Sequence, residues 1–156
     1  MRWVTRKRVR LDRTACSWLI LRHIDAVANI IYTDAQGMPA AIESGALPFH
    51  ETVAEEGEVT ERTSFQQLLV EYGLDENNPA LALMGDIVCA AEKGEPATAV
   101  EGPGLRAIAK GMNALARDDQ DMVERMLPVF DALYAYCQRQ VLGLHGWANE
   151  ESGWPD

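Results

Sequence analysis

The sequence predicts a mainly helical α+β domain, in which a small β-sheet from the N-terminal third is packed by a bundle of about five to six helices. Strand-like segments occur before Phe49, near-continuous helix signals follow Thr63, and 156 residues suffice to bury one core. An apolar fraction of 47% is typical of a globular chain and excludes a disordered one. We therefore expect one domain over residues 1–156.

The N-terminal third alternates strand and helix signals. Trp3 to Val9 interleaves strand-forming residues with cations, which predicts a short strand at a sheet edge. Asp12 is expected to cap a helix from Arg13 to about Ile24, and ANIIYT at residues 28–33 predicts a second strand. This strand–helix–strand order predicts two parallel strands joined by a right-handed crossover.

Two short elements and an acidic loop follow. Pro39 is expected to begin a short helix that Gly45 ends, and residues 47–49 predict a third short strand. Residues 50–61 contain five glutamates and are expected to form a loop.

The rest of the chain predicts helices with recognisable ends. Thr63 and Gln66 form the capping-box pattern T-x-x-Q, which begins a helix that Gly73 ends. Asn78-Pro79 begins the next helix, which ends at Lys93-Gly94, and Gly102-Pro103 begins another that runs to about Ala116.

The last predicted helix runs from Asp118 or Asp119 to about Leu142 and contains Pro128. We expect a kink or break near Glu124, because proline cannot donate the backbone hydrogen bond that a helix needs there. Its apolar stripe comprises Val123, Met126, Leu127, Phe130, Leu133, Tyr134 and Cys137. Residues 143–156 are expected to be loosely ordered or docked through their tryptophans.

Charge is distributed unevenly along the chain. Residues 1–22 hold seven Lys and Arg residues and one acid, Asp12, and are formally +6, whereas the other 134 residues hold seven cations and twenty-three acids, or −16. The arginines of this basic head must either pair with the acidic body or face an anionic ligand. The net charge of −10 disfavours nucleic acid as a partner, because phosphate neutralisation supplies most non-specific affinity.

The sequence also indicates a cytoplasmic protein without a membrane partner. No run approaches the roughly 18 apolar residues that span a bilayer, and the basic start lacks the apolar segment of a signal peptide. Cys16, Cys89 and Cys137 are odd in number and widely spaced, which is typical of reduced thiols.

Residues 4–25 read V-T-R-x-R-x-x-x-D-R-x-A-C-x-W-L-I-x-R-x-I-D, and further blocks follow in register. These blocks are Gly45–Phe49, Ser64-Phe65, Glu71–Leu74, Asp118-Asp119 and Phe130–Ala135. From residue 4 to about 137 the chain resembles the chromate-resistance domain, which is the C-terminal domain of the ChrB family. The resemblance implies a role in the chromate response. Full-length regulators of this family carry an additional DNA-binding domain before it, so we expect no DNA binding by this chain alone.

The arginines of the basic head are candidate anion ligands. Arg6, Arg8 and Arg10 alternate, so on a strand they would point to one face, with Arg13 and a helix N-terminus close by. Guanidinium groups and free helix N–H groups suit tetrahedral dianions such as chromate and sulfate. We predict anion binding by Arg6, Arg8, Arg13 and Arg22, and the alternative is that these arginines pair with the acidic body or are solvated.

The resemblance also implies a metal site. The E-x-x-H element of the family falls on Glu55 and Glu58 here, so a carboxylate replaces the histidine, and the histidine and acid after the I-V pair become Cys89 and Glu92. Asp131 matches the family directly and flanks an apolar stripe, where it requires an arginine or a metal as partner. The predicted ligands are Glu55, Glu58, Glu92 and Asp131. Such carboxylates favour iron, manganese or magnesium, and the alternative is solvated glutamates with Asp131 paired to Arg13 or Arg22.

Cys16 is the redox candidate. It lies one turn into a helix beside Arg13, a setting expected to lower the pKa of its thiol, and chromate is an oxidant. The alternative is an inert core cysteine, which is also the expectation for Cys137. No Cys–His dyad and no HExxH or CxxC motif occurs.

Two functions from different classes remain open. The first is a sensing or detoxification domain of the chromate-resistance family that binds an oxyanion or a metal ion, which an arginine-lined anion pocket would favour. The second is a small metal- or thiol-dependent enzyme acting on an oxyanion or a sulfur compound, which a metal with an open position beside Glu58 and Asp131 would favour. The sequence identifies no catalytic residue and is compatible with a homo-oligomer.

Overall fold

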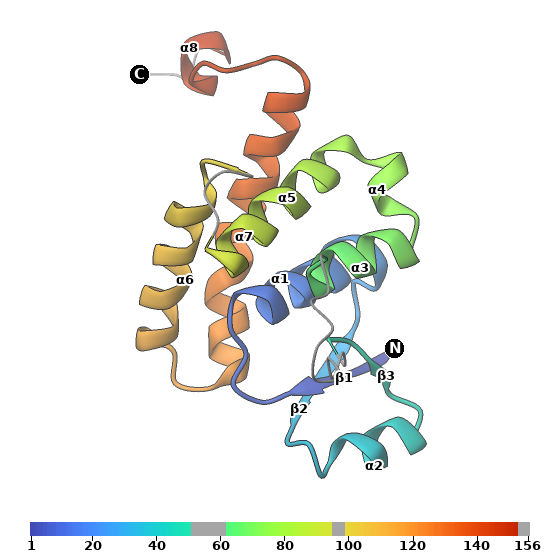
Figure 1. Cartoon of the computed structure of the whole chain (residues 1–156). Coiled ribbons are helices and arrows are strands. Elements are labelled where there is room, and N and C mark those ends of the chain that lie inside the picture. The colour runs from blue at the N-terminus through green and yellow to red at the C-terminus, as the bar shows by residue number, and fades with distance from the viewer. Residues whose placement is uncertain (51–61, 95–98, 153–156) are drawn as a thin grey trace.

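The computed structural model describes residues 1–50, 62–94 and 99–152. The N-terminal elements, in chain order, are β1 (Arg2–Arg6), α1 (Leu11–Leu19), the π-helix η1 (Ile20–Ile24), β2 (Asn29–Thr33), α2 (Met38–Glu43) and β3 (Leu47–Pro48). The remaining elements are α3 (Ser64–Glu71), α4 (Leu74–Asn77), α5 (Pro79–Lys93), α6 (Gly102–Leu115), α7 (Asp119–Val141) and α8 (Ala148–Ser152). The predicted α+β, mainly helical class is confirmed, with the small sheet below α1 and α3 and above α2 in Figure 1.

The sheet has the order β2-β1-β3, and both neighbours run parallel to β1. The parallel pairing expected for the first two strands is confirmed, with Arg2 opposite Asn29 and Arg6 opposite Thr33. β1 is nevertheless the central strand, not an edge strand, and its middle residues are buried. It also ends at Arg6 rather than Val9, because Arg8 adopts a left-handed conformation (φ 61°) that an extended strand cannot contain.

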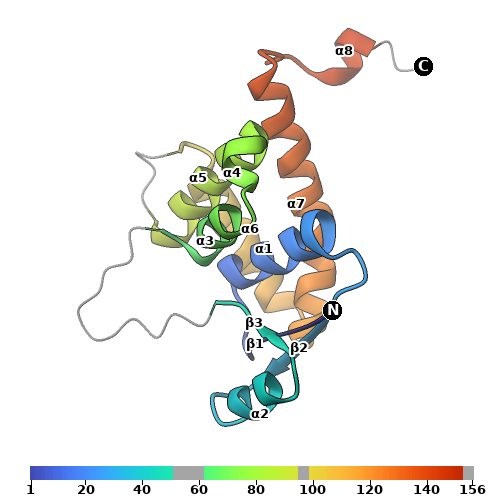
Figure 2. The same cartoon turned by 90° about the vertical axis from the view of Figure 1, so that its right-hand side faces the viewer.

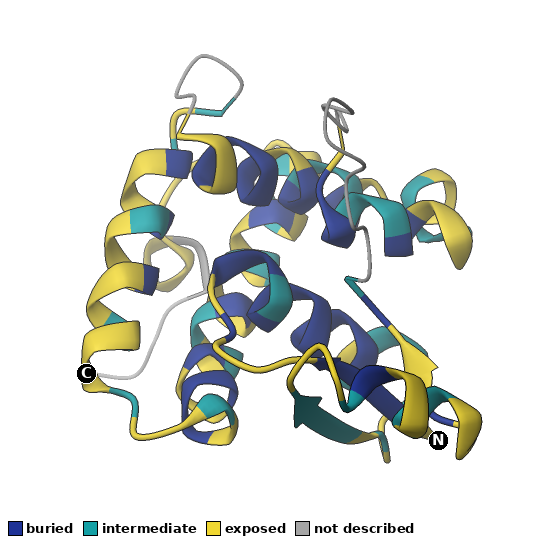
Figure 3. Cartoon of the chain, turned by 60° about the horizontal axis from the view of Figure 1, so that its bottom comes forward, coloured by how far each residue is buried: buried dark blue, intermediate teal, exposed yellow. Residues whose placement is uncertain are grey.

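Helix α1 lies at the centre of the helical layer and contacts α3, α5, α6 and α7 (Figure 2). Trp18 explains this position, because its ring packs against Phe65 of α3 and against Phe130 and Tyr134 of α7, with ring centroids 6.5, 6.3 and 5.6 Å away. Aromatic contacts of this kind add to the large area that each ring buries. Figure 3 shows buried residues on the inner faces of the helices and exposed residues on the outer faces.

The start of α1 corrects one prediction. Asp12 is not the N-cap, because the helix begins at Leu11 with Arg10 as a cap residue that makes no side-chain capping bond. The helix ends at Leu19, and the expected remainder to Ile24 is the π-helix, closed by a hydrogen bond from Asp25 N–H to the Ile20 carbonyl at 2.7 Å.

The other helix ends follow the sequence closely. Thr63 and Gln66 form the predicted capping box of α3, and the Asn78 side chain caps α5 through the Leu81 N–H. The short helices α4 and α8 are additions to the predicted set. The predicted break near Glu124 is wrong, since α7 is continuous over Asp119–Val141, and the alternative of a kink stays a prediction. Pro128 has no N–H to donate to the Glu124 carbonyl. Glu124 is exposed, so water can donate to this carbonyl instead.

The C-terminal segment extends beyond the other helices (Figures 1 and 2). Trp147 is 76% exposed, so docking through this tryptophan is wrong, and Trp154 lies outside the described residues. The apolar stripe of α7 is confirmed, with Val123, Met126, Phe130 and Cys137 buried. In the ranges described above, no helix combines the length and hydropathy that crossing a membrane requires.

Candidate functional site

A surface cavity of about 320 Å³ opens beside the loop that joins β1 to α1. We call it the arginine cavity, and it is lined by Arg6, Lys7, Arg8, Arg10, Asp12, Arg13, His50 and Glu92. These residues come from the end of β1, the loop that follows it, the first turn of α1, the second residue after β3 and the C-terminal turn of α5. The cavity therefore gathers most of the basic head around one space.

Local backbone geometry brings the loop residues together. Arg8 (φ 61°) and His50 (φ 57°) both adopt the left-handed conformation, and they are the described non-glycine residues that do so. This conformation costs a non-glycine residue roughly 1–2 kcal/mol, and such strain concentrates at functional sites. Between Arg8 and Arg10, Val9 is buried, and its N–H donates to Asp119 Oδ1 at 2.7 Å. The loop is thus anchored at Val9 while its neighbours reach the cavity.

The arginines and the lysine of the cavity make no ion pair with any described acidic residue. No ion pair within the described ranges involves Arg6, Lys7, Arg8 or Arg10. Arg13 donates from Nη1 to the Lys7 carbonyl at 3.2 Å, but its buried Nε has no partner. Burial lowers the pKa of Arg13, and repulsion from Arg6 and Arg10 lowers it further. The cavity thus carries an excess of positive charge.

Asp12 offsets only part of this excess, because its carboxylate also binds the start of α3. It accepts the N–H groups of Ser64 at 2.9 Å and Phe65 at 3.0 Å, which belong to the first turn of α3. His50 Nδ1 lies 3.2 Å from Asp12 Oδ2 and also hydrogen-bonds the Ser64 hydroxyl. The positive end of α3 therefore compensates a buried carboxylate, and the arrangement holds His50 at the cavity wall.

The structure brings together Arg6, Arg8 and Arg13 of the predicted anion set. The reasoning from strand alternation is wrong, because only Arg6 belongs to β1 and the others follow it. Arg10, which the sequence places on the same face as Arg6 and Arg8, also lines the cavity although it is not among the predicted ligands, and sequence reasoning missed Lys7. It also missed His50, for which no local signal exists, since its contacts with Asp12 depend on the tertiary fold.

Arg22 lies elsewhere and pairs with Asp131. Its Nε and Nη2 donate to the two carboxylate oxygens of Asp131, each at 3.0 Å, and Trp18 Nε1 donates to Oδ1 at 2.7 Å. The Arg22 guanidinium, followed by the Trp18 indole, holds the pKa of Asp131 below its usual range, although burial opposes the shift. The expectation that Asp131 needs a partner is confirmed, and one of the two candidate arginines provides it.

The predicted metal set is not assembled by the described residues. Glu92 lines the arginine cavity, Asp131 pairs with Arg22, and Glu55 and Glu58 lie outside the described residues. Within residues 1–50, 62–94 and 99–152, no group of three or more His, Cys, Asp or Glu side chains could hold a metal ion. A metal site that includes Glu55 and Glu58 stays a prediction.

The thiols are buried. Cys16 is fully buried, and burial, followed by the charge of Asp12, raises the pKa of its thiol well above the usual value. The expected lowering of this pKa is wrong, because desolvation and a nearby carboxylate outweigh Arg13. Cys137 is a core residue as predicted, and burial raises its pKa to about 12. Cys89 is also buried, so a thiol-dependent reaction has no exposed cysteine to use.

Comparison with known proteins gives one family. The family model of the ChrB C-terminal domain matches residues 3–137. The chain is 32% identical over 135 residues to Protein ChrB from Cupriavidus metallidurans. The matched residues cover 86% of this chain and 40% of that protein. It therefore spans less than half the length of this relative. No solved structure matches.

Proposed function

Because this chain belongs to the ChrB C-terminal domain family, we propose that it is a chromate-resistance-associated domain that binds a tetrahedral oxyanion such as chromate in the arginine cavity. Its role would be sensing or detoxification, with the loop between β1 and α1 responding to the bound anion. Arg6, Arg8, Arg10 and Arg13 would hold the anion, and His50 would contact it from the cavity wall.

The observation that supports this proposal is the convergence of four arginines and Lys7 on one cavity without acidic partners among the described residues. A planar guanidinium presents paired N–H donors that match two oxygens of a tetrahedral anion. Like charges held close together repel one another, and after burial, which is the larger cause, repulsion from Arg6 and Arg10 also lowers the pKa of Arg13. A bound dianion would offset this repulsion.

The position of the cavity suggests how binding could be transmitted. One anion would contact the loop after β1, the first turn of α1 and His50, which comes directly before residues 51–61. Asp12 connects the same region to the first turn of α3. Binding would therefore stabilise the packing of the sheet against α1 and α3.

The proposal is tested by melting temperatures measured in sulfate, molybdate and chromate at fixed ionic strength, with chloride as the control. An anion that binds only the folded state should add about 2.7 kcal/mol of stability at a hundredfold excess over its dissociation constant. We expect an increase with the tetrahedral dianions and a much smaller one in the Arg8→Ala/Arg13→Ala double variant. Equal increases in both proteins, or none beyond chloride, would contradict the proposal.

A further inference from the structure

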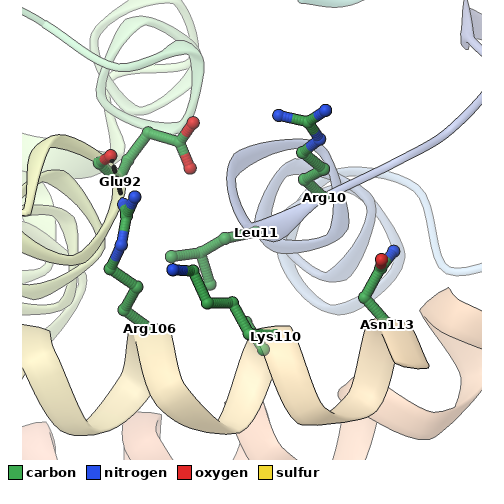
Figure 4. A pocket seen from close by; sticks show the side chains of 7 residues that line it. Arg10, Leu11, Glu92, Arg106, Lys110 and Asn113 are labelled. Atoms are coloured by element: carbon green, nitrogen blue, oxygen red, sulfur yellow. Dashed lines mark hydrogen bonds between the residues drawn. The ribbon is translucent and has the colours of Figure 1, made fainter. Parts of the chain in front are cut away.

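A second surface cavity, of about 330 Å³, adjoins the arginine cavity and shares Arg10 and Glu92 with it. We call it the α6 cavity, because Arg106, Lys110 and Asn113 rise into it from one face of α6 (Figure 4). Neither the sequence nor the family points to these three residues.

The α6 cavity has a mixed polar and apolar lining. Leu11 and Ala109 contribute apolar surface and are largely buried. Arg106 is held in place because its Nη1 donates to the Ala91 and Glu92 carbonyls at the end of α5, both at 2.8 Å. Lys110 is exposed and makes no ion pair with any residue in the described ranges.

The two cations are notable in so acidic a body, which has seven Lys and Arg residues among its 134 residues. Arg106 and Lys110 are four residues apart on one helix, a spacing at which like charges weaken a helix. They also line a cavity that shares Arg10 and Glu92 with the arginine cavity, so they lie near its cations. A second anionic group bound here would offset the repulsion between Arg106 and Lys110 and their repulsion from the cations of the arginine cavity.

Each of the two adjoining cavities is larger than a small inorganic anion needs. Since a water molecule takes up about 30 Å³, a five-atom oxyanion fills a minor part of either cavity. Ligand sites for organic molecules begin at about 300 Å³ and combine apolar surface with a few polar groups. Each cavity reaches that size.

We infer that the arginine cavity and the α6 cavity together bind one organic molecule with two anionic groups. One group lies among the arginines of the arginine cavity, and the second lies at Lys110 and Arg106. The linker between them crosses Leu11 and Ala109 and carries a hydrogen-bond donor for Glu92. The inference rests on the proposed function for its first anionic group and adds the second group and the linker to it.

Isothermal titration calorimetry with alkane bisphosphonates of graded spacer length, and with methylphosphonate as the single-anion probe, tests the inference at fixed ionic strength. Linking two groups that bind neighbouring sites raises affinity once the linker spans them. We expect one spacer length to bind at least tenfold more tightly than methylphosphonate. Lys110→Met should reduce this bisphosphonate to the methylphosphonate level and leave the methylphosphonate dissociation constant unchanged.

The matched control is Arg139→Met, which removes one cation near the far end of α7 and should change neither affinity. If methylphosphonate binds and no bisphosphonate binds more tightly, the inference is wrong and the proposed function stands. An equal effect of Arg139→Met would also overturn it, since the gain would then reflect net charge. If neither probe binds the wild-type protein, both proposals fail.

Discussion

The carboxylate of Asp12, in the first turn of α1, accepts the backbone N–H of Ser64, in the first turn of α3, at 2.9 Å. The two residues are 52 positions apart in the chain, and the carboxylate is almost fully buried. This bond fixes the starts of two helices against each other, and His50 at the wall of the arginine cavity contacts both residues. The structure of the cavity therefore depends on a carboxylate whose oxygens contact the start of α3 and His50.

Replacing Asp12 should be strongly destabilising. Asp12→Ala leaves the buried N–H groups of Ser64 and Phe65 without an acceptor, and hydrogen bonds to charged groups contribute about 1.5–3 kcal/mol each. We expect the free energy of unfolding in urea to fall by about 3 kcal/mol. The control Asp86→Ala removes an exposed aspartate and should cost less than about 0.5 kcal/mol. Similar losses in the two variants would refute the capping role of Asp12.

The left-handed conformation of Arg8 predicts different effects for two truncations. Arg8→Gly and Arg8→Ala both remove the guanidinium, but only glycine adopts φ 61° without a steric penalty. Arg8→Gly should therefore be about 1 kcal/mol more stable than Arg8→Ala, and both should lose sulfate affinity equally. Chemical denaturation and calorimetry measure the two quantities. A less stable glycine variant would mean that this conformation is not strained.

Two glycines of α6 should respond in opposite directions to alanine. A Cβ on Gly102 would lie 2.8 Å from the Ala90 Cβ and 3.0 Å from the Ala90 carbonyl carbon, so α5 and α6 would have to separate. A Cβ on Gly111 would meet nothing within 4 Å. Gly102→Ala should lower the free energy of unfolding by about 1–3 kcal/mol, whereas Gly111→Ala should raise it by up to about 1 kcal/mol. Stabilisation by both substitutions would contradict the close α5–α6 contact.

The Arg22–Asp131 pair should contribute a pH-dependent part of the stability. Since the pKa of Asp131 is lower in the folded state, the unfolded state binds more protons in acid. The contribution is fully present above about pH 4, the ordinary pKa of aspartate, and is lost as the pH falls through the folded-state pKa.

Because both side chains are close to half exposed, we expect a contribution of only about 1 kcal/mol. The measurement is urea unfolding of the wild-type protein and Asp131→Asn from pH 7 to pH 3. The difference in free energy of unfolding should be constant down to about pH 5 and shrink below pH 4. If this difference in free energy of unfolding grew as the pH fell, it would contradict a lowered pKa of Asp131 in the folded state.

Local patterns predicted the helix ends well, and tertiary contacts account for what was missed. The capping box of Thr63 and Gln66 involves residues three apart, so the sequence contains the whole signal. Asp12 has the same kind of capping role, but its partners are in another helix, and the local pattern therefore assigned it to the wrong one.

In the candidate site, too, some residues could be predicted from local sequence signals and others only from tertiary contacts. The uneven distribution of charge pointed to Arg6, Arg8 and Arg13, because a run of cations next to an acidic body is visible in one dimension. Lys110 carries no such signal. It joins the site only because α6 packs beside α1 and α5, which depends on side-chain packing across the core.

The central claim, that the arginine cavity binds a tetrahedral oxyanion, is tested most directly by calorimetric titration of molybdate at fixed ionic strength. The two proteins to compare are Arg6→Ala/Arg8→Ala, which removes two exposed cations of the cavity, and Arg2→Ala/Arg22→Ala, which removes two cations of the basic head outside it. The proposal predicts saturable binding of one molybdate to the wild-type protein and to the second variant, and at least a tenfold loss of affinity in the first. Equal affinities in the two variants, or no saturable binding by the wild-type protein, would contradict it.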